Sequence, residues 1–303
     1  MLDGISLDQL RTFVTAVDEG SFSAAARKLR RVQSVVSHTV SSLEEQIGVT
    51  LFDRSDRYPR LTPEGLALLV DARCILAGIE GFKARAKGMA AGLEAELSVV
   101  VDVMFPIEAI ANAAQQFKLT YPNTPLRLYV EALGAAFAPL LDGRCGLGVV
   151  GPLPVAPPSV GKEALGCIKL VMVAALSHPL ASFEGMIPRE ELMKHVQLVL
   201  TDRTDLSSGR EAGVISRLTW RLADLFAKHA FLLQGLGWGG MPAHAVERDV
   251  AQGRLKVLSI EDVPAGGLPL PMSVVYPSAN PPGPAGRWFI GFLQAQSSLE
   301  RVP

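Results

Sequence analysis

The sequence predicts a mixed α/β protein of 303 residues, with a small helical N-terminal domain, one long helix and a two-lobed C-terminal domain. Three observations predict this class. Apolar residues recur at helical spacing through the first sixty residues, and an unbroken apolar heptad follows. From residue 96 onward, short apolar runs typical of buried strands alternate with helical segments. A chain of this length is expected to fold as two or three domains.

Composition narrows the class further. Hydrophobic residues make up 49% of the chain, enough for a substantial interior, and a formal net charge of −1 excludes a uniformly basic nucleic-acid binder. The three cysteines are widely separated, so the pattern predicts no disulfide framework, metal site or cofactor. The N-terminus lacks a signal-peptide pattern, and no apolar run is long enough to span a membrane. We therefore expect a cytoplasmic protein that does not bind membranes.

The first fifty residues predict three short helices. Ser6 and Gln9 form a capping-box pattern that opens the first, Gly20 ends it, and "AAARKL" is the second. In the third, Val36, Val40 and Leu43 form a stripe that predicts a buried face. Serines and one histidine occupy another face of this third helix. This spacing is typical of a helix-turn-helix, whose last helix enters the major groove of DNA.

Small side chains on that face would let the helix backbone approach DNA closely. Hydroxyl groups and the helix N-terminus bind phosphates, Gln33 suits adenine, and His38 suits a base edge or a phosphate. The alternative is a solvated helix face on which serine is merely tolerated.

Residues 51–62, "LFDRSDRYPRLT", have apolar ends around a charged turn that contains proline, and they predict a hairpin wing. From residue 27 to residue 60 there are seven Lys or Arg against four Asp or Glu, whereas residues 1–26 hold one against four. A phosphate-facing surface requires this concentration of positive charge; the alternative is an ordinary exposed turn. The residues predicted to contact DNA are Arg27, Arg31, Gln33, Ser34, Ser37, His38, Ser41, Arg54, Arg57 and Arg60.

Thr62, Pro63 and Glu64 form a helix-start signal that opens a long helix of roughly 40 Å. Its heptad seam predicts helix–helix pairing with a second subunit, although such a stripe also suits packing on its own domain. The seam residues are Leu68, Ala72, Ile75, Ile79, Phe82, Ala86 and Met89.

Residues 7–66 resemble the N-terminal domain of LysR-type transcriptional regulators. The matching elements are "L..F......GSFS.AA..L", "QS.VS..V..LE...G..LF.R" and "LT..G". The resemblance implies a winged helix-turn-helix over residues 1–62, a dimerising linker helix over 63–91 and an effector-binding domain over 92–303. It also implies that Gln33, Ser34, Ser37 and His38 face the major groove and that Arg57 enters the minor groove. Val32, Ser34 and His38 depart from the family pattern, which puts the operator sequence in doubt.

The family resemblance further implies double-stranded operator DNA and a small-molecule effector as partners, and a homotetramer built as a dimer of dimers. RNA polymerase is a further candidate partner.

"SHPLA" at residues 177–181 and "GLGWGGMPAHAVERDVAQGRL" at residues 235–255 resemble the effector domain of the same family, which has the type 2 periplasmic-binding-protein fold. Lobe I is expected over about 92–164 and 269–303, and lobe II over about 165–268. A cleft should form where the strands end. We expect its lining in residues 102–105, 131–134 and 201–208, with either Arg203 or Arg210 available to pair with an anionic effector. The acidic residues of the cleft favour an amine instead. The candidate effector contacts are Asp102, Met104, Phe105, Glu131, Thr201 and Arg203.

Two alternative functions compete with this interpretation. A thiol redox sensor of the same architecture would use Cys167 as its reactive thiol, with Cys145 as a possible partner. An enzyme fused to a DNA-binding domain lacks any recognisable catalytic constellation. Gly235, Gly237 and Gly240 match a dinucleotide fingerprint, but a helical pattern precedes them where the fingerprint needs a strand. A tight turn between two helices suits these glycines better. We therefore expect no enzymatic activity.

Overall fold

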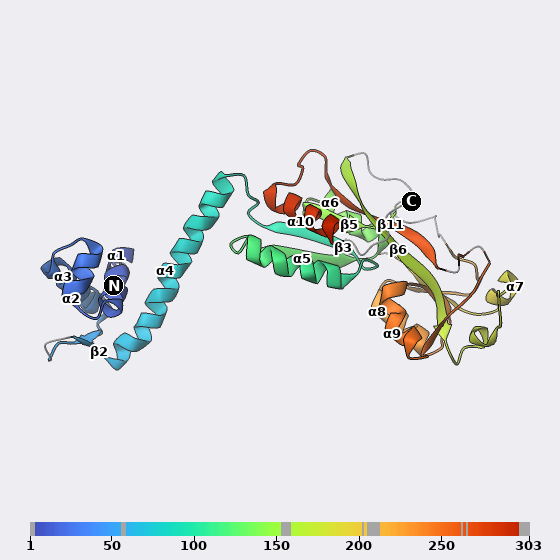
Figure 1. The fold of residues 1–303 in the computed structure, drawn as a ribbon, viewed down its shortest axis with the longest axis horizontal. Helices are drawn as coiled ribbons and strands as arrows, with labels where there is room; N and C mark the ends of the chain where they lie inside the picture. The colour runs from blue at the N-terminus through green and yellow to red at the C-terminus, as the bar shows by residue number, and fades with distance from the viewer. Residues whose placement is uncertain are drawn as a thin grey trace. The chain divides into compact units, whose positions relative to one another are not determined.

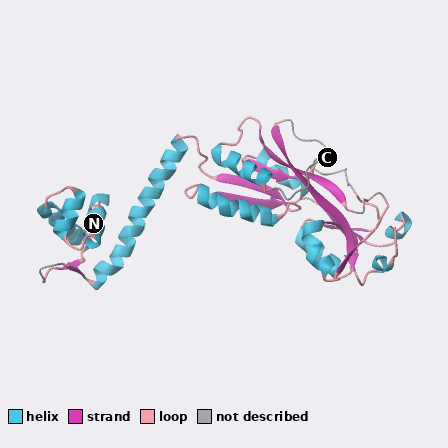
Figure 2. Ribbon diagram, in the orientation of Figure 1, coloured by secondary structure: helices cyan, strands magenta, loops and turns pink. Residues whose placement is uncertain are grey.

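The computed structural model describes residues 4–55, 59–152, 159–201, 203–204, 213–261, 263–264 and 266–296. The chain forms two compact units, Met1–Gly88 and Met89–Pro303. Figure 1 shows the elements of each unit, and Figure 2 shows that the first is almost wholly helical whereas the second combines helices with strands.

The first unit contains three short helices, a small hairpin and a long helix. Ser6 and Gln9 form the predicted capping box at the start of the first helix, each side chain accepting from the other's backbone N–H. Gly48 ends the third helix in the left-handed conformation, with a φ of 71°. The elements are α1 (Leu7–Asp18), α2 (Phe22–Leu29), α3 (Gln33–Ile47), β1 (Phe52–Asp53), β2 (Arg60–Leu61) and α4 (Pro63–Ala90).

An aromatic cluster holds the wing against the helices. Phe52 on β1 makes edge-to-face contacts with Phe13 and Phe22, at centroid distances of 5.8 and 5.1 Å. The start of α4 packs equally closely, because a Cβ at Gly65 would lie 2.2 Å from the Leu51 carbonyl oxygen. Only glycine therefore fits at this crossing of helix and wing.

The second unit is built on one nine-stranded sheet in the order β4-β3-β5-β11-β6-β9-β7-β8, with β10 beside β6. The strands are β3 (Leu97–Asp102), β4 (Leu126–Glu131), β5 (Leu147–Val150), β6 (Val160–Ala175), β7 (Gln197–Leu200), β8 (Thr219–Leu222), β9 (Trp238–Pro242), β10 (Leu255–Val257) and β11 (Leu268–Pro277). The helices are α5 (Ile107–Thr120), α6 (Ala138–Leu141), α7 (Arg189–Leu192), α8 (Leu225–Leu233), α9 (Ala243–Ala251) and α10 (Pro284–Ala295), with short 3-10 turns at Leu133–Phe137 and Pro179–Ser182.

Two long strands connect the halves of this unit. β6 and β11 pair antiparallel from Val160–Pro277 to Leu170–Leu268, and their register shifts between Met272 and Ser273. Opposite that bulge stands Gly166, with a φ of 136°. On one side of the crossing β3, β4 and β5 run parallel; on the other β7 runs parallel to β8 and β9. The predicted two-lobed α/β architecture is therefore present (Figure 1).

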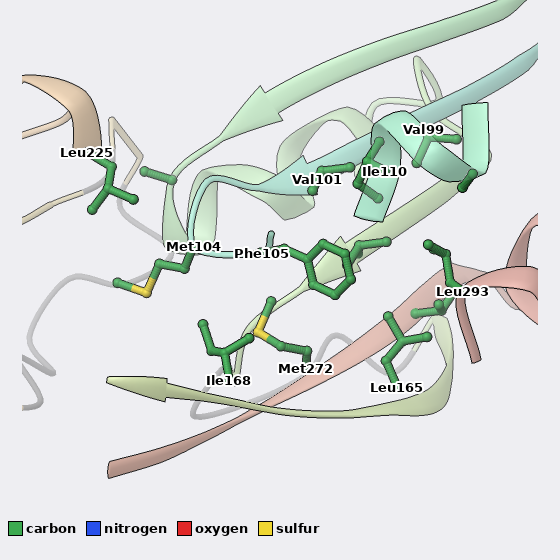
Figure 3. Close-up of a cluster of buried hydrophobic side chains, with 14 of the residues drawn as sticks. Val99, Val101, Met104, Phe105, Ile110, Leu165, Ile168, Leu225, Met272 and Leu293 are labelled. Atoms are coloured by element: carbon green, nitrogen blue, oxygen red, sulfur yellow. The ribbon is translucent and has the colours of Figure 1, made fainter. Parts of the chain in front are cut away.

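Helices cover both lobes. α5 and α10 pack together beside β3, where Phe117 lies 6.1 Å from Phe289 between ring centroids. In the other lobe α8 and α9 are joined by a hydrogen bond between His229 Nε2 and Asp249 Oδ2, which lie 2.7 Å apart. Buried side chains from both lobes form one hydrophobic cluster, which Figure 3 shows around Phe105 and Met272.

Candidate nucleic-acid interface and ligand cleft

The core of the first unit fixes which face of α3 is exposed. Val36, Val40 and Leu43 are at most 2% exposed, as the stripe predicts. Of the predicted DNA-contacting residues on α3, Gln33, Ser34 and His38 are exposed, and Ser37 and Ser41 are half-buried. The helix therefore presents a band of small polar side chains to solvent, opposite its packed face.

The N-terminus of α3 is open to an anion. Val32 occupies the N-cap position and makes no side-chain hydrogen bond to the first turn. The first N–H groups of a helix have no partner within it, and they bind phosphate readily. Val32 and Val35 are 67% and 44% exposed, which gives this end an apolar edge that the sequence did not predict to be functional.

Several of the predicted basic residues have partners within the first unit. Arg31 forms two parallel hydrogen bonds to Asp8, at 2.7 and 2.8 Å, and these bonds lower the pKa of the Asp8 carboxyl. Arg54 donates to Glu44 Oε2 at 2.7 Å and lies 5.5 Å from the Phe22 ring centroid.

Glu44 has a second role that the sequence did not reveal. Its Oε1 accepts from the N–H groups of Leu51 and Phe52, at 2.8 and 3.0 Å. Arg54 and Glu44 therefore fasten the wing to α3, and a phosphate would have to compete with that pair.

Two of the remaining basic candidates lie on the surface of the first unit. Arg27 and Arg60 are exposed, on α2 and β2. The pKa of Asp53 is lowered mainly by hydrogen bonds from Ser55 and to a smaller extent by the charge of Arg60. Arg57, the residue assigned to the wing tip, lies outside the described residues.

The apolar seam on α4 is divided between two uses, which corrects the expectation that all seven residues pair with a second subunit. Ala72 is only 3% exposed and belongs to the core of the first unit, against which Leu68 also packs. Further along, Ile75, Phe82 and Met89 are 48%, 70% and 49% exposed, while Ala86 is exposed and Ile79 half-buried. Only the second part of the seam is free to meet another helix.

In the second unit a cavity of about 210 Å³ opens where β3 and β4 end. Three charged side chains line it: Glu131 from β4, and Arg203 and Asp224 from the other lobe. The rest of its lining is small and apolar, including Val103 and Val130. Of the six predicted effector contacts, the structure brings only Glu131 and Arg203 together at this cavity.

Met104 and Phe105, predicted to line the cleft, are not among the residues that line this cavity. Both are in the hydrophobic cluster, at 7% and 4% exposed, and Figure 3 shows them among buried side chains. Thr201 is half-buried and is not part of the cavity lining. Arg210, the alternative to Arg203, lies outside the described residues.

Asp102, another predicted effector contact, is 2% exposed and is not part of the cavity lining either. Its Oδ1 accepts from the Met104 N–H at 2.9 Å, and the N–H groups of Leu133 and Gly151 also donate to its carboxylate. Burial raises the pKa of Asp102 to about 6, against the opposing effect of these donors. The carboxylate therefore ties together the segments that follow β3, β4 and β5.

The cysteines do not favour the redox alternative. Cys167 and Cys145 are buried, at 7% and 2% exposed, and burial raises the pKa of the Cys145 thiol to about 11. A reactive thiol needs a lowered pKa and access to solvent. Cys74 on α4 is exposed, and all three thiols are free.

Of the fingerprint glycines, Gly235 and Gly237 lie in the turn between α8 and β9, and Gly240 lies within β9. The preceding helix is therefore confirmed, but the expected second helix is a strand. No described group of three His, Cys, Asp or Glu side chains is arranged to hold a metal ion. Within the described residues, no helix combines the length and apolar character that a bilayer crossing requires.

Together, a winged helix-turn-helix and a two-lobed α/β unit with a cavity define a DNA-binding regulator that carries a ligand-sensing domain. Residues 7–66 match the family model described as bacterial regulatory helix-turn-helix protein, lysR family, and residues 90–298 match the LysR substrate binding domain. The chain belongs to the LysR family of transcriptional regulators, whose members are not enzymes.

Named relatives agree with this assignment. The probable HTH-type transcriptional regulator YhaJ of Escherichia coli (strain K12) is 30% identical over 266 residues, covering 85% of this chain and 87% of YhaJ. The HTH-type transcriptional activator AllS of Klebsiella pneumoniae is 30% identical over 259 residues, covering 82% and 93%. Among solved structures, the Corynebacterium glutamicum OxyR C206 mutant is 26% identical with a TM-score of 0.57, covering 96% of this chain and 92% of that one. CrgA from Neisseria meningitidis is 23% identical with a TM-score of 0.52, covering 95% and 98%, which supports the fold alone.

Proposed function

We propose that this regulator reads an operator through the exposed polar face of α3 and through its wing. A small molecule bound in the inter-lobe cavity would change its affinity for that operator. The observation that carries the proposal is the pairing, in one chain, of an open polar recognition helix with a cavity that has charged residues from both lobes. The regulator would act in the cytoplasm. Ligand coupling of about 1–3 kcal/mol suffices for such control.

Within the DNA interface we assign different roles to two residues. His38 is exposed on α3 and reads a base edge, whereas Arg57 supplies charge to phosphates and the minor groove. The apolar Val35, three residues before His38 on α3, suits a thymine methyl group.

Footprinting and gel-shift titrations on the DNA upstream of the protein's own gene test these roles. We expect Arg57→Ala to weaken binding to all sequences and to reduce the slope of log K against log salt by about one. We expect His38→Ala to change the preferred sequence instead. Arg189→Ala, an exposed arginine on α7, is the matched control and should leave both properties unchanged. If Arg57→Ala and His38→Ala both give the wild-type footprint, these assignments are refuted.

We also propose that exposed apolar residues of α4 pair two subunits, and that two such dimers form a tetramer. Phe82 is 70% exposed, and Ile75 and Met89, which lie on the same face of α4, are 48% and 49% exposed. Side chains of this size are usually covered when they form a stripe. Phe82→Glu should lower the mass measured by sedimentation, while Lys83→Glu beside it should not. An unchanged mass for Phe82→Glu would remove α4 from the interface. RNA polymerase is the partner we propose for transcriptional activation.

A further inference from the structure

The positions that would hold an anion at the end of the parallel strands are already filled by the chain itself. Parallel strands β3, β4 and β5 end together, and backbone N–H groups at such an edge attract negative charge. Here the N–H groups of Met104, Leu133 and Gly151 all donate to the carboxylate of Asp102. Leu133 adopts a left-handed backbone, with a φ of 52°, directly after β4.

Asp102 therefore acts as an internal anion. A ligand carboxylate would have to displace a buried side chain from three hydrogen-bond donors in order to use the same groups, and it would meet the negative charge of Asp102 behind the cavity wall.

The described lining of the cavity has an excess of acidic groups. Glu131 and Asp224 line it against Arg203, so its described lining has one more acid than base. Asp224 is the N-cap of α8, where its Oδ1 accepts from the Ala227 N–H at 2.6 Å. Because that bond uses only one of its oxygens, the other is left to accept from a ligand.

We propose that the effector of this regulator carries a protonated amine, which Glu131 and Asp224 bind from opposite lobes, and a compact apolar body that contacts Val103 and Val130. The cavity measures about 210 Å³, which is small for a ligand pocket, so the effector is a small metabolite. This inference rests on the proposed role of the cavity as the effector site.

Matched probes separate charge from size. Butylamine and benzylamine are added to the full-length protein, and binding is measured by calorimetry and by thermal shift. The carboxylate and the alcohol with the same carbon skeleton are measured in parallel with each amine. We expect at least one amine to bind and to raise the melting temperature, and its carboxylate counterpart not to bind.

Glu131→Gln and Asp224→Asn should each weaken amine binding at least tenfold. Asparagine is itself a good N-cap, so Asp224→Asn removes the charge and keeps the cap of α8. Glu190→Gln, an exposed acid on α7 of the same lobe, is the control and should bind like the wild type. Asp102→Ser should free the three N–H groups and let the carboxylates bind.

Preferential binding of the carboxylates to the wild type, or binding of neither class at 10 mM, overturns the inference. So does amine binding that survives both Glu131→Gln and Asp224→Asn. Gel shifts on the upstream DNA are run with the same protein samples. If amines bind as expected but the protein ignores its DNA, the proposed function fails while the ligand class stands. If DNA binds and the amines do not, only the ligand class fails.

Discussion

Lys228 is an unusual element of the core, and its substitution gives a sharp prediction. Its side chain, on α8, is 3% exposed, and its Nζ donates to the Gly240 carbonyl oxygen on β9 at 2.6 Å. Burial lowers the pKa of Lys228 from 10.5 to about 8. The unfolded chain binds the Lys228 proton more tightly than the folded protein does. Protonation of Lys228 therefore favours unfolding. That cost in stability is fully present below pH 8 and disappears as the pH rises toward 10.5.

The shift corresponds to a cost of about 3 kcal/mol at pH 7, since one pKa unit is about 1.4 kcal/mol. Lys228→Met removes this cost but leaves the Gly240 carbonyl without its donor, which costs about 1–3 kcal/mol. We therefore expect Lys228→Met to be as stable as the wild type or more stable at pH 7. Between pH 7.0 and 9.5 its stability should fall by about 2 kcal/mol relative to the wild type.

Urea unfolding followed by tryptophan fluorescence measures this difference. The protein has three tryptophans, Trp220, Trp238 and Trp288, so the signal reports the second unit alone. Taking the difference between variant and wild type cancels other groups, such as Cys145, whose raised pKa has the opposite effect on the pH dependence. Lys118→Met, at an exposed position on α5, serves as the control. A difference that stays constant from pH 7.0 to 9.5 would refute the reasoning.

Two further predictions concern the first unit and the thiols. Phe52→Ala should destabilise the first unit by about 3–5 kcal/mol and abolish operator binding, because it removes the ring that joins the aromatic cluster behind the wing. The unfolding of the second unit, measured by tryptophan fluorescence, should not change. A loss of stability in that measurement would contradict the independence of the two units. Thiol titration of the native protein should label Cys74 rapidly and the buried Cys145 and Cys167 only on unfolding, and DNA affinity should not respond to peroxide. Rapid labelling of Cys167 would revive the redox alternative.

Periodicity predicted the first unit well because its helices are amphipathic. Val36, Val40 and Leu43 recur at helical spacing, so the buried face of α3, and hence its exposed face, followed from the sequence. The heptad on α4 could not show where its pairing surface begins. Ala72 and Ile75 are both seam positions of the heptad. Tertiary packing alone decides that Ala72 is covered by the first unit and that Ile75 is exposed.

The cleft was harder to predict because its residues come from distant segments. Glu131 and Asp224 are far apart in the chain, and no local pattern relates them. Met104 and Phe105 were misplaced because the chain turns at the end of β3, where the alternation of a strand no longer indicates which side chains face inward. The strand β9 was missed since "WGGMP" lacks the branched residues that indicate a strand.

The crossing between the lobes limits how a ligand can act. β6 and β11 are hydrogen-bonded neighbours over ten paired positions, so the lobes cannot slide past each other without breaking that ladder. They can change their mutual twist where the ladder is already interrupted, at Met272 and Ser273 opposite Gly166. Amines of different size would then rotate the lobes about a common axis, and they would differ in the extent of that rotation rather than in its direction.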